Sequence, residues 1–235
     1  MPHPRVAMAS CVLLGLAFSL PVRAQSHPPA PVVSFEAAAV VADGLPPDGE
    51  AVFFSVAREP QGYHQRVVSR DGVEVANAEG RARFDLAGQE VPLKSLWVVV
   101  DVASGGYSVA APPGASVREL PFPHRGFEVG APGLVNRLRH ERESVHMLVA
   151  RAGTGAGAGV WGLRTWDTAP TDRDGADDDQ VLTGLSDFEP LGVAGAAAPP
   201  ERFGKGDVLV VIDPRELAFY ATRLVGPPVT GGSAP

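Results

Sequence analysis

An acidic stretch at residues 167–179 carries side chains that could bind a metal ion. It holds five aspartates between Asp172 and Asp179. Calcium prefers several hard oxygen ligands, and carboxylates at alternate positions before a glycine turn supply them in a compact loop. Asp172, Asp174 and Gly175 match positions three, five and six of such a loop, and Asp178 matches position nine. The spacing predicts a calcium site formed by Asp172, Asp174 and Asp178.

The same stretch has a second interpretation, as a solvated acidic loop. The first ligand position holds Pro170 and the twelfth holds Val181, where a bidentate acid belongs, and Arg173 lowers the local negative charge. An acidic loop without an ion would keep the domain soluble and would cap the short helix predicted after it. Calcium is therefore the only cofactor that the sequence suggests, and the two interpretations stay open.

Histidines and glycines offer further chemistry, but their spacing is uninformative. A zinc helix needs histidines four residues apart, whereas His140 and His146 are six apart, and His64 and His124 add no known pattern. The glycine run at residues 153–159 precedes a predicted strand instead of the helix that a phosphate cradle requires, so it is interpreted as a hairpin loop. No Gly-x-Ser-x-Gly elbow is present. We predict no catalytic residue.

The amino-terminal segment predicts export. A basic start is followed by an apolar run of 15 residues from Val6 to Leu20 and by small residues at Val22 and Ala24. We expect a signal peptide at residues 1–24, cleaved after Ala24, and a secreted or periplasmic mature protein. The single cysteine, Cys11, lies inside that signal, so the mature chain would hold no thiol or disulfide.

Charge and hydropathy exclude two classes of partner. Removing Arg5 and Arg23 with the signal leaves 20 − 2 = 18 basic against 27 acidic residues, a net charge of −9. Such a balance disfavours nucleic acid, because phosphate binding needs a basic face. No segment after the signal reaches the roughly 20 apolar residues of a spanning helix, so no membrane span is expected. The bias toward Ala, Gly, Pro, Val and Arg is typical of a GC-rich bacterial genome.

The elements that must position any site are predicted to be strands, organised around a hairpin at residues 95–113. Leu96, Val98 and Val100 fall on one face of its first strand and Trp97 and Val99 on the other, as in an interior strand covered on both faces. Residues 104–106 supply a short turn, and the alternation resumes from Tyr107.

Further strands precede this hairpin. We predict them at residues 35–42, 51–58, 63–69, 73–76 and 81–86, with residues 59–62 breaking the second and Asp71-Gly72 forming a hairpin turn. In the last of these, Arg81, Arg83 and Asp85 are expected to face outward. About seven strands therefore lie between residues 33 and 112, which indicates a sandwich or barrel.

The rest of the chain is predicted to extend this β structure. After a Pro-rich linker at residues 25–31 and a sandwich at 32–113, residues 114–143 form a Pro/Gly-rich connection with a short helix at Leu134, Val135 and Leu138. Residues 144–225 form a second β region, either a separate lobe or an extension of the first, with a helical turn near Val181 and Leu182. Residues 226–235 are expected to be a disordered tail.

One stretch, residues 73–84, resembles the bacterial immunoglobulin-like modules of secreted proteins. In such modules a turn like the one at residues 77–80 is followed by a strand with an apolar-polar-apolar run, here Ala82-Arg83-Phe84. The resemblance covers the first third of the mature chain. It implies an immunoglobulin-like β-sandwich without the cysteine pair of antibody domains, and it brings no catalytic residues.

These observations predict a mainly β protein, an immunoglobulin-like or related antiparallel sandwich with additional carboxy-terminal strands and one or two short helices. The function expected is that of an exported, non-catalytic binding or structural protein with an unknown protein or glycan partner. The alternatives are a calcium-stabilised surface or assembly component and a secreted hydrolase. A pocket that gathers two or more of His64, His124, His140 and His146 with carboxylates would favour the hydrolase.

Overall fold

The structure is a computed structural model that describes residues 29–61, 64–115, 117–119, 127–130, 133–136, 144–153, 158–167, 180–182, 188–191, 203–214 and 216–224. These residues form strands joined by turns and contain no helix. None of them belongs to a helix long and apolar enough to cross a membrane. The protein is mainly β, as predicted.

Seven strands between residues 32 and 110 form two of the four sheets. They are β1 (Val32–Glu36), β2 (Ala39–Asp43), β3 (Glu50–Gln61), β4 (His64–Val75), β5 (Ala82–Asp85), β6 (Ser95–Asp101) and β7 (Tyr107–Ala110). One sheet has the order β1-β2-β5 and the other the order β4-β3-β6-β7. All pairings within the two sheets are antiparallel.

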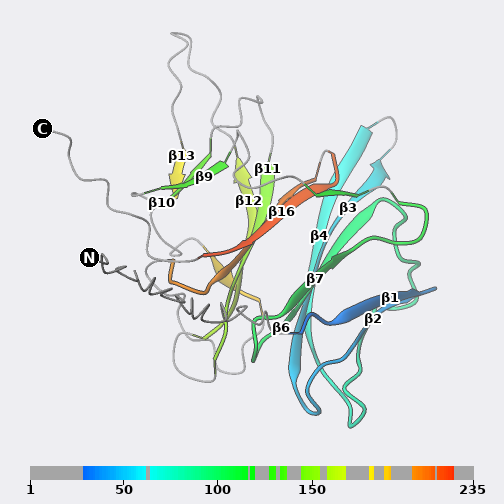
Figure 1. Ribbon diagram of the computed structural model, residues 1–235. Helices are drawn as coiled ribbons and strands as arrows, with labels where there is room; N and C mark the ends of the chain where they lie inside the picture. The colour runs from blue at the N-terminus through cyan, green and yellow to red at the C-terminus, as the bar shows by residue number, and fades with distance from the viewer. Residues whose placement is uncertain are drawn as a thin grey trace, which may run out of the picture.

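The later strands form the other two sheets. The six-stranded sheet has the order β14-β12-β11-β15-β16-β8 and comprises β8 (Arg118–Glu119), β11 (Ser144–Arg151), β12 (Gly159–Asp167), β14 (Glu189–Pro190), β15 (Val208–Asp213) and β16 (Ala218–Arg223). A small sheet of order β13-β10-β9 comprises β9 (Phe127–Gly130), β10 (Gly133–Asn136) and β13 (Gln180–Leu182). Figure 1 shows β1 to β7 on one side of the molecule and β11, β12 and β16 on the other.

Strand β6 is the interior strand that its apolar alternation predicts. Leu96, Val98 and Val100 pack with residues of β11 and β15 in one apolar layer, between the four-stranded and six-stranded sheets. Trp97 and Val99 pack in a second layer, against the three-stranded sheet, and both are fully buried. The four-stranded sheet is therefore covered on both faces, and the molecule is built in stacked β layers.

The β3–β4 hairpin differs from the prediction. We expected a break after residue 58 and a turn at Asp71-Gly72, yet β3 continues to Gln61 and pairs with β4 through twelve consecutive residue pairs. Gly72 lies in mid-strand because the ring of Phe84 packs over it: a Cβ there would lie 2.5 Å from Cε2 of Phe84. The glycine provides room for an aromatic ring, and the hairpin turn predicted from Asp-Gly is wrong.

Two further element predictions need correction. The strand expected at residues 35–42 is two strands, because the chain turns back at Ala37 and Ala38. Their carbonyls accept hydrogen bonds from Val91 N at 3.2 Å and Leu86 N at 2.9 Å, so a distant loop holds this turn. Helical turns were predicted at residues 134–138 and near residues 181 and 182, but residues 133–136 form β10 and residues 180–182 form β13, which pair with each other.

Candidate functional site

The outer surface of the three-stranded sheet carries the densest group of charged contacts among the described residues. Strand β5 contributes Arg83 and Asp85, β1 contributes Glu36 and β2 contributes Asp43, with Arg81 just before β5. These five residues are named the charged face. Alternation along each strand places them there, because Val40, Ala42, Ala82 and Phe84 point the opposite way, into the core.

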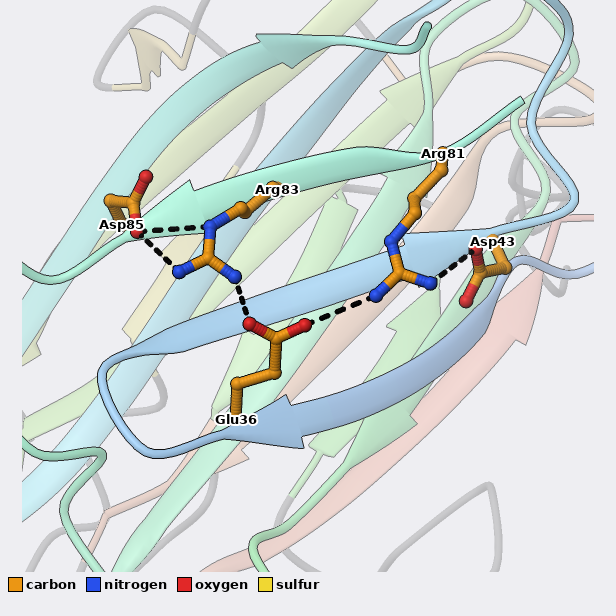
Figure 2. Close-up of polar contacts among 5 residues, drawn as sticks. All are labelled: Glu36, Asp43, Arg81, Arg83 and Asp85. Atoms are coloured by element: carbon orange, nitrogen blue, oxygen red, sulfur yellow. Dashed lines mark hydrogen bonds and ion pairs between the residues drawn. The ribbon is translucent and has the colours of Figure 1, made fainter. Parts of the chain in front are cut away.

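The five side chains form a continuous chain of ion pairs. Arg83 contacts Asp85 at 2.9 Å and Glu36 through its other nitrogen, and Arg81 contacts Glu36 at 3.1 Å and Asp43 at 3.4 Å. Figure 2 shows Glu36 between the two arginines, so acids and bases alternate from Asp85 to Asp43. The side chains are 41 to 65% exposed, which leaves them open to polar partners.

The chain of ion pairs also covers the middle strand. Val41 points toward the charged face, opposite Ser34 on β1 and Arg83 on β5, yet it is fully buried. Arg81 and Arg83 start at or next to β5 and reach Glu36 on β1, so their side chains cross the middle strand β2 while their guanidinium groups remain exposed. The result is a polar surface with three carboxylates and two guanidinium groups, a net charge of −1.

A second charged pair lies inside the fold and has a structural role. Nε and Nη2 of Arg151 each donate to the carboxylate of Asp207 at 2.7 Å. Oδ2 of Asp207 also accepts a hydrogen bond from Gly204 N at 2.6 Å, and the Asp207 side chain is 1% exposed. The hydrogen bond to Asp207 raises the pKa of Arg151. This pair fixes the turn that enters β15, and burial leaves Asp207 little access to a ligand.

His146 is the one predicted candidate whose side chain the structure describes, and it lies in an apolar layer. It is on β11, 3% exposed, with its ring 6.3 Å from that of Phe54 on β3. Within the described part of the chain, neither ring nitrogen has a hydrogen-bond partner. Burial lowers the pKa of His146 to about 4. A neutral imidazole without partners in this layer is poorly placed for proton transfer to a substrate.

The other predicted site residues are three aspartates and three histidines. Asp172, Asp174 and Asp178 lie outside the described residues, as do His124 and His140, and only the backbone of His64 is described, at the start of β4. Among the described residues, no group of three or more His, Cys, Asp or Glu side chains could hold a metal ion. The predicted calcium site remains a prediction.

The charged face was only partly visible in the sequence. Alternation in residues 81–86 correctly places Arg81, Arg83 and Asp85 outward. Glu36 and Asp43 were missed as their partners, because residues 35–42 were interpreted as one strand and the β1–β2 turn was not recognised. The signal that could have found it is the change from alternation in residues 32–36 to a continuous apolar run in residues 37–42.

Comparison with known proteins gives this chain no relative. No family model matches it, and neither a curated protein nor a solved structure shows significant similarity to it.

Proposed function

We propose that this protein is an exported, non-catalytic β-sandwich that acts as a binding or structural module, with a protein or glycan as its partner. The observation that carries the proposal is the charged face, an exposed and continuous set of ion-paired side chains on the three-stranded sheet. Guanidinium and carboxylate groups held in this way can exchange hydrogen bonds with the polar groups of a partner.

The roles of two buried aspartates support a non-catalytic function. Asp207 is occupied by Arg151 and by a backbone amide, and Asp101 is occupied by Ser104 and by the amide of Ala103. Together with the apolar surroundings of His146, this favours a binding or structural protein over a secreted hydrolase, which needs a base within reach of its substrate.

The strand order supports the immunoglobulin-like interpretation. Constant-type immunoglobulin domains place seven strands in two sheets, with the first, second, fifth and fourth strands in one and the third, sixth and seventh in the other. Here β1-β2-β5 and β4-β3-β6-β7 keep that arrangement, except that β4 lies beside β3 instead of β5. Modules of this architecture commonly bind through surfaces of a rigid sandwich, and function must still be tested at the site itself.

The test is photo-crosslinking in the cell that exports the protein. A photoreactive residue at Ser34, which is exposed beside the charged face, should give a protein adduct, and the same residue at exposed Glu119 on β8 serves as the matched control. We expect Arg81→Ala together with Arg83→Ala to abolish the Ser34 adduct and to leave any Glu119 adduct unchanged.

A glycan partner needs a second measurement. Sedimentation with purified, insoluble cell-wall glycan should retain the mature protein, and the double arginine variant should remain in the supernatant. If neither crosslinking at Ser34 nor sedimentation depends on Arg81 and Arg83, the charged face is not a binding surface and the proposal loses its main support.

A further inference from the structure

Strand β4 is an edge of its sheet and differs from every other edge among the described residues. It has twelve residues, whereas the next longest edge strand, β1, has five. It contains no proline, and its pairing with β3 runs without a bulge. Proteins normally protect edges with short strands, prolines, bulges or charged side chains, since an edge exposes backbone groups that can pair with another strand. Of these devices β4 has only charged side chains, among them Arg66, Arg70 and Glu74.

Two charges on this strand have no ion-pair partner in the described part of the chain. Arg66 is exposed near one end, and Glu74 lies eight residues later near the other end. Burial, and then the nearby charge of Asp85, raises the pKa of Glu74. No positive charge in the described part of the chain pairs with its carboxylate. An arriving cation would stabilise the ionised carboxylate at this position.

We propose that β4 is an assembly surface, which pairs antiparallel with β4 of a second copy of this chain about a twofold axis at Arg70. In that register Arg66 of each copy lies opposite Glu74 of the other, so both unpaired charges are neutralised. Val67, which is 41% exposed, lies opposite Val73 on the other face of the strand. Opposite charges and apolar pairs at facing positions are what stabilise antiparallel strands.

Arg70 meets its own copy at the twofold axis, which is the one unfavourable contact in this register. Its guanidinium already contacts Glu59 at 2.9 Å within the same hairpin, so each arginine brings a compensating carboxylate. Residues that are an even number of positions apart share a face of a strand, so Arg66, Arg70 and Glu74 stay together. The two four-stranded sheets would continue into one another, and both β4 edges would be covered.

Glu74 lies near Asp85 of the charged face, but the inference depends on pairing along β4 and does not rest on the proposed function. Antiparallel pairing of two identical strands is isologous, so it forms a closed dimer and leaves no further β4 edge for growth.

The experiment measures association of the mature chain, residues 25–235, by sedimentation equilibrium. We expect a dimer. Arg66→Glu alone and Glu74→Arg alone each place like charges opposite one another twice, and each should raise the dimer dissociation constant by roughly tenfold or more. Arg118→Glu, an exposed change on β8, is the control and should leave the dissociation constant unchanged.

The decisive measurement mixes the two single variants and asks whether they associate. One chain then carries two acids and the other two arginines at the facing positions, so a heterodimer should form although neither variant associates well alone. The combined change Arg66→Glu/Glu74→Arg in one chain should likewise restore the dimer. Circular dichroism of each variant verifies that it is folded. A wild-type monomer at every concentration, or a dimer that Arg66→Glu and Glu74→Arg leave intact, overturns the inference.

Discussion

His146 places a titratable ring in the apolar layer between the four-stranded and six-stranded sheets. On its own sheet it lies opposite Ile212, and across the layer its ring is near that of Phe54. Asp71 on β4 lies opposite Phe54, and Asp213 on β15 follows Ile212. Because burial lowers the pKa of His146 to about 4, the fold strongly favours the neutral ring.

This environment predicts an acid-dependent loss of stability. The unfolded chain takes up the His146 proton near pH 6.5 and the folded chain only near pH 4, so stability falls between these values and the loss is complete below the lower one. The size of the effect is about 3 kcal/mol. His146→Leu should remove it, and urea unfolding of both proteins at about pH 7.5 and about pH 4 measures the difference. Equal pH dependence in the two proteins would contradict the prediction, since the carboxylates titrate alike in both.

A substitution at Gly72 would test how closely Phe84 packs against this single residue. A Cβ at this position would approach Cε2 of Phe84 to 2.5 Å, and Phe84 stacks on Phe53 with the ring centroids 5.6 Å apart. We expect Gly72→Ala to lower the free energy of unfolding by about 1 to 3 kcal/mol through overpacking. Phe84→Leu should make room, so the double variant should be less destabilised than the sum of the two single variants. Simple additivity in denaturant unfolding would mean that the ring does not oppose the new methyl group.

At the scale of elements, two carboxylates on different strands should contribute very differently to stability. Asp207 is buried and accepts hydrogen bonds from Arg151 and Gly204, whereas Asp85 on β5 is 65% exposed beside Arg83. Asp207→Ala leaves Arg151 without its carboxylate and should cost about 2 to 4 kcal/mol, somewhat less than a fully buried pair because Arg151 is 28% exposed. Asp85→Ala should cost less than about 1 kcal/mol. Thermal or denaturant unfolding compares them, and equal costs would refute this ranking.

The segment between β12 and β13 in the sequence contains the predicted calcium ligands Asp172, Asp174 and Asp178. If calcium binds only the native protein, ion at about 100 times its dissociation constant should add roughly 2.7 kcal/mol of stability. A thermal melt in millimolar calcium, compared with chelator, measures it. Asp172→Asn with Asp174→Asn should abolish the shift, and magnesium controls for screening of the repelled acids. An equal shift in magnesium would identify a solvated acidic loop.

Local alternation predicts strands well and their connections less well. Residues 96–100, with apolar side chains on both faces, correctly indicate an interior strand, and Arg81, Arg83 and Asp85 correctly indicate an outward face. The total of seven strands is confirmed although two errors cancel in it: the first predicted strand is two strands, and two later ones are a single strand. Both errors arise where contacts distant in the sequence determine whether the chain turns. Residues 86 and 91 hold the turn at Ala37 and Ala38, and the ring of Phe84 packs over Gly72.

Prediction of the candidate site, the charged face, meets the same limit. Period-two alternation gives the direction of a side chain, but pairing across strands depends on register, and register depends on turns. Glu36 is 45 residues from Arg81 in the sequence and contacts it only because β1, β2 and β5 share a sheet. Once the β1–β2 turn was missed, the ion pairs could not be predicted.

At the scale of the whole molecule, the four-stranded and six-stranded sheets share one apolar layer. Residues of β3 and β6 pack there with residues of β11 and β15, so neither sheet buries this face without the other. Polar contacts also join these two sheets at one end. Arg223 on β16 donates a hydrogen bond to the carbonyl of Gly105, in the β6–β7 turn, at 3.1 Å, and Gly153 N donates one to Ala103 O. These contacts favour cooperative unfolding of the whole described fold.

Two tryptophans can report separately on the unfolding of the strands before residue 113 and of those after residue 144. Trp97 lies on β6 and Trp161 on β12, and both are fully buried, in different apolar layers. One variant with Trp161→Phe and Trp166→Phe keeps only Trp97, and a second with Trp97→Phe and Trp166→Phe keeps only Trp161. Within each variant, the urea midpoint from fluorescence should equal the midpoint from circular dichroism, because the shared layer cannot be exposed on one side alone. Comparing the two probes within one variant removes the cost of the substitutions themselves. A fluorescence midpoint that departs from the circular dichroism midpoint in either variant would mean that the strands before residue 113 and those after residue 144 unfold as separate domains.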